Sequence, residues 1–165
     1  MIRQATVKDA DEIARIHVET WKAVYNGIIP DAYLQGLSHE KRAAHWCENL
    51  KKAAKGIYVA QEDDKIMGWI SFGPSRDEDA YNIGEVYAIY VQPDCWGYGY
   101  GTQLMALAET KLRGMEFKTV TLWVLKYNHL ARAFYTKAGY CFDGAKRQLS
   151  IGGKDLWELR YAKTG

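Results

Sequence analysis

The segment from Ile83 to Leu112 constrains the fold of this chain most, because it predicts a buried strand, a glycine-rich turn and a helix in direct succession. The strand is indicated by Val86 to Val91, a run of β-branched and aromatic residues that Pro93 closes. After the turn, apolar residues recur at helical spacing up to the stop signal at Gly114, namely Leu104, Met105, Leu107, Ala108 and Leu112.

The turn can bind phosphate, because its glycines let backbone N–H groups converge and the helix start adds partial positive charge. It departs from the dinucleotide-binding fingerprint, since Thr102 stands where a third glycine is required. The strand at Thr119 to Leu125 is followed by Lys126 rather than by an acidic residue for a ribose. A nucleotide-dependent redox enzyme is therefore disfavoured. A glycine connector without a ligand remains the alternative.

The whole pattern predicts one α/β (α+β) domain over residues 1–165. The strand at 119–125 follows a helical crossover, so we expect it to be parallel to the strand at 86–91. The other expected elements, in chain order, are a strand at 2–5, a helix ended by Gly27, a helix containing Ala43, Cys47 and Leu50, a hairpin of 57–60 with 66–72, a helix at 128–138, and a terminal hairpin of 149–151 with 156–161.

Charge and cysteine content limit the binding partners and the cellular compartment that we expect. The 165 residues carry a net charge of +2, which gives no reason to expect binding to nucleic acid or to a membrane surface. The 3 cysteines are widely spaced, which favours a reducing compartment over a disulfide framework. Neither an N-terminal apolar segment nor a membrane-spanning run is visible. We therefore expect a cytoplasmic protein.

A second motif lies in the helix at 128–138, where Asn128, Ala131, Phe134 and Tyr135 precede Gly139-Tyr140. Together with Val91-Gln92-Pro93 and Gly99-Tyr100-Gly101, this helix resembles, in the right order, the two motifs of the GNAT N-acetyltransferase superfamily. Trp96 departs from the pattern, since the family has Gln or Arg at this position.

The resemblance covers essentially the whole chain and implies a single-domain GNAT fold. In this fold a central mixed, twisted sheet is flanked by helices and its central parallel strands splay apart, so that a cofactor can pair with exposed backbone. The implied cofactor is acetyl-CoA. The residues expected to bind it are Ile89, Tyr90, Val91, Trp96, Gly97, Tyr98, Gly99, Tyr100, Gly101, Thr102, Asn128 and Arg132.

The resemblance also implies catalytic roles for two residues. Tyr135 would protonate the departing thiolate, because a phenol carries an exchangeable proton, and Glu85 would take the proton of the amine. A core tyrosine and a surface carboxylate at the end of a strand are the respective alternatives. Asn128 can be an N-cap as well as a cofactor ligand.

The implied reaction is N-acetylation of a primary amine on a small molecule, peptide or protein. Its acceptor pocket would be lined by Trp21, Tyr25, Tyr33 and Trp69, although aromatic core packing is the favoured explanation for any one of them. Histidines and cysteines lack the paired spacings of a zinc site, so we expect no metal. A non-catalytic acyl-CoA-binding module is the alternative function, and a homodimer is an open alternative for the assembly.

Overall fold

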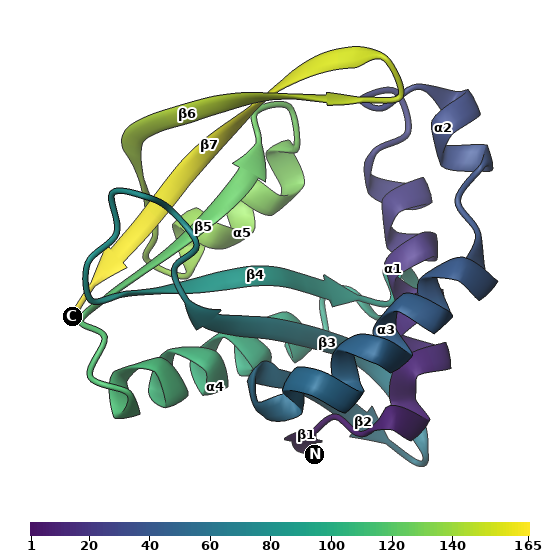
Figure 1. Cartoon of the computed structure of the whole chain (residues 1–165), viewed down its shortest axis with the longest axis horizontal. Helices are drawn as coiled ribbons and strands as arrows, with labels where there is room; N and C mark the ends of the chain where they lie inside the picture. Colours follow the sequence, from purple (N-terminus) through teal and green to yellow (C-terminus); the bar gives the residue numbers. More distant parts are fainter.

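A seven-stranded sheet runs through the molecule in the order β1-β2-β3-β4-β5-β7-β6 (Figure 1). The computed structural model describes residues 1–165, apart from the side chains of residues 53 and 54. The strands are β1 (Ile2–Gln4), β2 (Ile57–Glu62), β3 (Lys65–Pro74), β4 (Ile83–Val91), β5 (Thr119–Leu125), β6 (Cys141–Ile151) and β7 (Lys154–Thr164). The helices are α1 (Ala10–Val24), α2 (Asp31–Gln35), α3 (His39–Ala53), α4 (Tyr100–Gly114) and α5 (His129–Lys137), with 3-10 turns η1 (Val7–Asp9), η2 (Ala54–Gly56) and η3 (Pro93–Cys95).

Helices cover both faces of the sheet, because side chains alternate between the faces along each strand. On β3, Trp69 joins a core cluster with α1 and α3, whereas the next residue, Ile70, joins a cluster with α4. In Figure 1, α1 and α3 accordingly lie on a different side of β3 and β4 from α4. The predicted mixed sheet flanked by helices is confirmed.

The central parallel strands are paired over a short length only. β4 and β5 run parallel from Ile83 opposite Thr119 to Glu85 opposite Thr121, and beyond these residues they diverge (Figure 1). A bulge lies at the point of divergence, because Val86 and Ala88 pair with successive residues of β3 and leave Tyr87 as an extra residue. The expected splay of the two central strands is therefore present.

The paired end of β4 and β5 is held closed by the crossover helix. Leu112 of α4 is fully buried and lies directly against Gly84, where an added Cβ would approach a Leu112 methyl to 2.9 Å. A side chain at residue 84 would thus push α4 away from the sheet. The absence of a Cβ lets the helix pack closely at the point from which the strands separate.

The terminal hairpin is longer than the sequence indicates. The expected strands 149–151 and 156–161 extend to Cys141–Ile151 and Lys154–Thr164. β6 is an edge strand that exposes most of its residues. Its first half therefore lacks the alternation of apolar and polar residues by which a strand is predicted from sequence. Its register also shifts between Phe142 and Lys146, where Gly144 has φ of +95°. In the described part of the chain, no helix is long and apolar enough to cross a bilayer.

Candidate active site

The divergence of β4 and β5 opens a cavity of about 610 Å³, which we call the central cavity. One wall is β4 from Val86 to Val91, and the opposite wall is the end of β5. The turn before α4, the helices α1 and α5, and the hairpin of β6 and β7 complete the lining. This cavity contacts most of the residues that the sequence predicts to act on a cofactor. The lining includes Ile89, Tyr90, Val91, Trp96, Gly97, Gly99, Tyr100, Gly101, Thr102, Asn128 and Tyr135.

The glycine turn has the backbone conformation that its sequence requires. Gly97 and Gly99 have φ of +87° and +88°, values that side chains disfavour, and Gly99 is the N-cap of α4. In the described structure no side chain caps α4, so the first N–H groups of the helix remain available to a ligand. Together with the helix dipole, they form a site suited to an anion.

Three residues at the glycine turn differ in their relation to the central cavity. Trp96 lines the central cavity, and its indole Nε1 donates to the carbonyl oxygen of Val91 at 2.8 Å. Gly101 faces α5, because an added Cβ would lie 3.2 Å from the Phe134 ring. Tyr98 is 74% exposed and is not among the lining residues, so its predicted cofactor contact has no counterpart in this arrangement.

Tyr135 and Asn128 reach the central cavity from the same helix. Asn128 caps α5, since its Oδ1 accepts the Ala131 N–H at 3.1 Å, and it also lines the cavity. The position of Asn128 is therefore compatible with both expected roles, as an N-cap and as a cofactor ligand. Burial raises the pKa of the Tyr135 hydroxyl, so this group is protonated at neutral pH and can donate a proton.

The aromatic residues of α1 meet β4 on the other side of the cavity. The Trp21 Nε1 donates to the Tyr90 hydroxyl at 2.9 Å, and the Tyr25 ring packs edge-on against Trp21 with centroids 5.0 Å apart. Burial raises the pKa of both Tyr25 and Tyr90. These hydroxyls are therefore neutral hydrogen-bonding groups within the cavity. Tyr33 lies on α2 and lines a separate hollow beside it.

Trp69 is a core residue in this structure. Its side chain has no exposed surface, and its ring packs edge-on against Trp46 and Tyr90 at centroid distances of 4.6 Å and 5.1 Å. The side of β3 that carries Trp69 is covered by α1 and α3, and Trp69 does not line the central cavity. The structure thus places Trp69 in the aromatic core, and its predicted contact with an acceptor has no counterpart in this arrangement.

Glu85 is also buried away from the central cavity. Its Oε1 accepts the backbone N–H of Arg76, and its Oε2 accepts from the Arg76 guanidinium, both at 2.9 Å. The residue is 1% exposed, so it is not the surface carboxylate that one reading expected. The general-base role expected for Glu85 is not supported by this position, because the carboxylate faces the 75–82 loop and does not line the cavity.

Arg132 holds α5 in place. Its Nε donates to the Tyr161 hydroxyl at 2.9 Å, and its other nitrogen donates to the Lys126 carbonyl at 2.8 Å. Arg132 is not among the residues that line the cavity. The structure therefore places this predicted cofactor residue in contacts that join α5 to β7 and to the residue that follows β5.

Sequence reasoning missed a carboxylate that does line the cavity. Glu158 lies on β7, is 17% exposed at its side chain, and pairs with Arg147 at 2.9 Å. Its charge acts on the hydroxyls of both Tyr25 and Tyr90. A sequence signal existed, because strand alternation places Glu158 on the same side of β7 as the buried Leu156. Among the described residues, no group of three or more potential ligands could hold a metal ion.

Comparisons with a family model and with related proteins point to the same family. The acetyltransferase (GNAT) family matches residues 21–140 of the chain. An uncharacterized N-acetyltransferase of Bacillus subtilis, YuaI, is 34% identical over 128 residues, which are 77% of this chain and 72% of that protein. A probable N-acetyltransferase of Mycobacterium tuberculosis, Rv2775, is 28% identical over 149 residues, covering 87% of this chain and 80% of the relative.

Solved structures share the fold. The PaiA N-acetyltransferase of Thermoplasma acidophilum, crystallised with coenzyme A, has a TM-score of 0.80 at 19% identity over 100% of this chain and 98% of its own. The yncA protein of Salmonella typhimurium, crystallised with its cofactor acetyl-CoA, has a TM-score of 0.73 at 19% identity over 99% of this chain and 92% of its own. At this identity the likeness concerns the arrangement of the elements.

The pairing of Glu85 with Arg76 leads to a prediction about stability. Glu85→Gln removes a charge-assisted hydrogen bond from a buried site, so we expect the free energy of unfolding to fall by about 1.5–3 kcal/mol. Urea denaturation measures this change. Arg76→Gln is the companion variant: it removes the exposed partner and leaves the buried Glu85 carboxylate without its counter-charge, so it is expected to cost at least as much. An unchanged stability in Glu85→Gln would contradict the anchoring role.

Proposed function

The chain belongs to the GNAT acetyltransferase family, and we propose that it transfers an acetyl group from acetyl-CoA directly to a primary amine. The observation that carries the proposal is the central cavity between β4 and β5, which joins an uncapped helix start to a buried, protonated tyrosine. In this proposal the donor lies along the gap, with its pyrophosphate at the turn and its thioester near Tyr135.

The turn would hold the pyrophosphate mainly through backbone. The N–H groups at the start of α4 supply donors, and the helix dipole favours the negative charge. The backbone of Ile89, Tyr90 and Val91 borders the gap that a pantetheine arm would enter, where it could pair as an additional strand. Trp96 would cover the arm rather than contact the phosphate through a polar side chain.

Glu158, rather than Glu85, is the carboxylate that we propose to accept the amine proton. It lines the cavity together with Tyr25 and Tyr135, and a carboxylate there attracts an ammonium ion and then takes its proton. The free amine attacks the thioester carbonyl, the C–S bond breaks, and Tyr135 donates its proton to the departing thiolate. The nitrogen of the tetrahedral intermediate loses its second proton, which returns Tyr135 to its protonated form, and Glu158 releases the first proton to solvent.

The reaction itself tests the function. Acetyl-CoA should stabilise the folded protein by about 2.7 kcal/mol at a hundredfold excess over its dissociation constant, whereas NAD should have no effect. Incubation with acetyl-CoA and a panel of amines should release free thiol in step with acetylated amine. Binding without thiol release for any amine would favour the alternative of a non-catalytic acyl-CoA-binding module. Equal stabilisation by NAD would contradict the cofactor assignment.

Tyr135→Phe tests the proposed acid. The ring and its packing remain, but the exchangeable proton is lost, so kcat should fall about 10²-fold while acetyl-CoA affinity changes little. Steady-state kinetics and calorimetry measure the two quantities. Tyr140→Phe is the matched control, because Tyr140 is fully buried and does not line the central cavity. Weakened cofactor binding with unchanged kcat would make Tyr135 a positioning residue.

Glu158→Gln tests the proposed base. We expect kcat near neutral pH to fall about 10²-fold and to recover as pH rises, because the fraction of free amine then increases without help from the protein. The pH profile of kcat is the measurement. Arg147→Gln is the matched control, since it breaks the same ion pair from the other side. An equal loss in both variants would indicate that the ion pair matters only for structure.

A further inference from the structure

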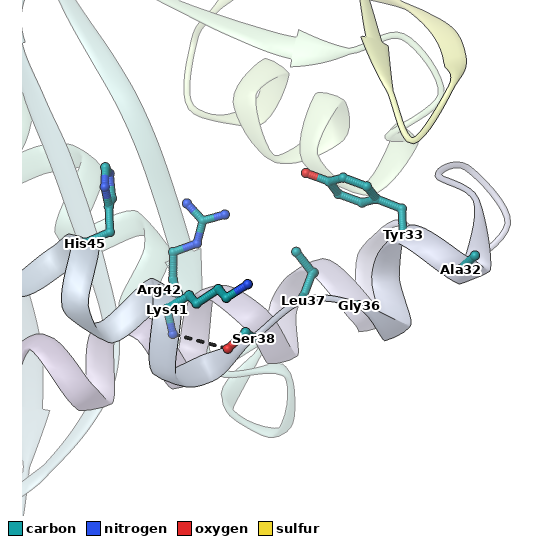
Figure 2. Close-up of a pocket in the computed structure, with 8 residues that line it drawn as sticks. All are labelled: Ala32, Tyr33, Gly36, Leu37, Ser38, Lys41, Arg42 and His45. Carbon is teal, nitrogen blue, oxygen red and sulfur yellow. Dashed lines mark hydrogen bonds between the residues drawn. The ribbon is translucent and has the colours of Figure 1, made fainter.

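A second cavity, which the proposed reaction does not use, lies between α2 and the start of α3 (Figure 2). Its volume is about 490 Å³, and we call it the basic cavity because its lining contains Lys41, Arg42 and His45 but no carboxylate. Tyr33 and Ser38 also line it. Figure 2 shows the Tyr33 hydroxyl pointing toward the side of α3 that carries Arg42 and His45.

The positive charges of the basic cavity are not neutralised by the protein. In the described part of the chain, neither Lys41 nor Arg42 has a carboxylate within salt-bridge distance, whereas the neighbouring His39 pairs with Asp11 at 3.1 Å. Both cations stand in the first turn of α3, where positive charge opposes the helix dipole. An anion bound in the cavity would relieve this unfavourable arrangement.

The basic cavity borders the central cavity through an aromatic contact. The Tyr33 ring packs against Trp21, a lining residue of the central cavity, with centroids 6.4 Å apart. The tip of the β6–β7 hairpin closes over the same ring, since an added Cβ at Gly152 would lie 2.8 Å from the Tyr33 Cβ. Ile151 from this hairpin lines the central cavity. Trp21 and Tyr33 therefore form the boundary at which the two cavities adjoin.

The charge of Arg42 also acts on the aromatic residues that separate the two cavities. Burial lowers the pKa of His17 to about 3, and the guanidinium of Arg42 adds to this effect. His17 packs against both Trp21 and Tyr90, with centroids 5.7 Å and 5.2 Å apart. His17 is therefore neutral at physiological pH, and Arg42 is the charged group on this side of the wall.

We infer that the acceptor is a small amine that also carries an anionic group, a carboxylate or a phosphate, and that Arg42 and Lys41 bind this group. The inference rests on the proposed acetyl transfer. Glu158 in the central cavity attracts the ammonium end of such a molecule, and the basic cavity attracts its anionic end. Opposite charges in two adjoining cavities select a molecule with the complementary charge distribution.

Acceptor kinetics test the inference directly. The panel contains aminocarboxylates from glycine through γ-aminobutyrate to ε-aminocaproate, each with its neutral amide, and phosphoethanolamine with ethanolamine. We expect at least one acidic acceptor to exceed its neutral partner by about tenfold to a hundredfold in kcat/KM, which is the effect of one charge-assisted hydrogen bond. The carboxylate and phosphate arms distinguish the two anions.

Arg42→Gln should remove this preference by raising KM for the acidic acceptor and should leave the neutral partner unchanged. The Arg42 side chain makes no hydrogen bond to the described residues, so the variant should fold normally. Arg113→Gln, at the far end of α4, is the matched control and should behave like the wild type. Arg42→Glu should reverse the preference toward a diamine.

The outcomes separate this inference from the proposed function. Acetylation of neutral amines at the same efficiency as acidic ones would overturn the inference and leave acetyl transfer intact. An equal loss for acidic and neutral acceptors in Arg42→Gln, or acetylation of acidic peptides but of no small acid, would also overturn it. Failure of acetyl-CoA to bind would overturn acetyl transfer itself. Calorimetry of the acidic probes with the CoA-saturated protein, in wild type and Arg42→Gln, measures the subsite without turnover.

Discussion

The short parallel pairing of β4 and β5 determines the position of every group in the candidate site. Three residue pairs join the strands, and the bulge at Tyr87 then turns β4 away from β5. Separating two strands leaves backbone polar groups without ladder partners, which is unfavourable unless other donors or acceptors replace them. Trp96 replaces one partner by donating to the Val91 carbonyl. The remaining gap is suited to a ligand that presents amides of its own, as a pantetheine arm does.

The closed end of the gap is held by charge as well as by packing. Glu85 fixes the start of the 75–82 loop through Arg76, and Asp77 in the same loop accepts from the Trp123 Nε1 of β5 at 3.0 Å. Arg160 of β7 then contacts Asp77 and Asp79 at 3.3 Å and 2.8 Å. These contacts tie β4, β5 and β7 together beside the point of divergence. This acidic loop is thus part of the frame that holds the three strands together at the closed end of the gap.

The sequence predicted the elements whose signals are local. The bounds of β5 were predicted to the residue, and those of α4 and α5 closely, because periodicity, glycines and the Asn128 cap lie within each segment. The contacts that individual side chains make with distant parts of the chain could not be predicted in the same way. Glu85, Arg132 and Trp69 have the right residue types for a site, but each is engaged by a group distant in sequence or by another helix. Glu158 reaches the cavity only because β7 inserts between β5 and β6, an order that strand patterns do not reveal.

Burial of the central cavity affects how strong a base is needed to deprotonate the amine. Tyr25, Tyr90 and Tyr135 each have a raised pKa because of burial, so they surround the gap with neutral hydroxyls. The same desolvation disfavours an ammonium ion and lowers the pKa of an amine that enters. In the proposed reaction, a carboxylate such as Glu158 removes a proton that this environment already destabilises, and the neutral amine is the nucleophile. The cations that would bind an anionic group of the acceptor line the basic cavity, outside this buried zone.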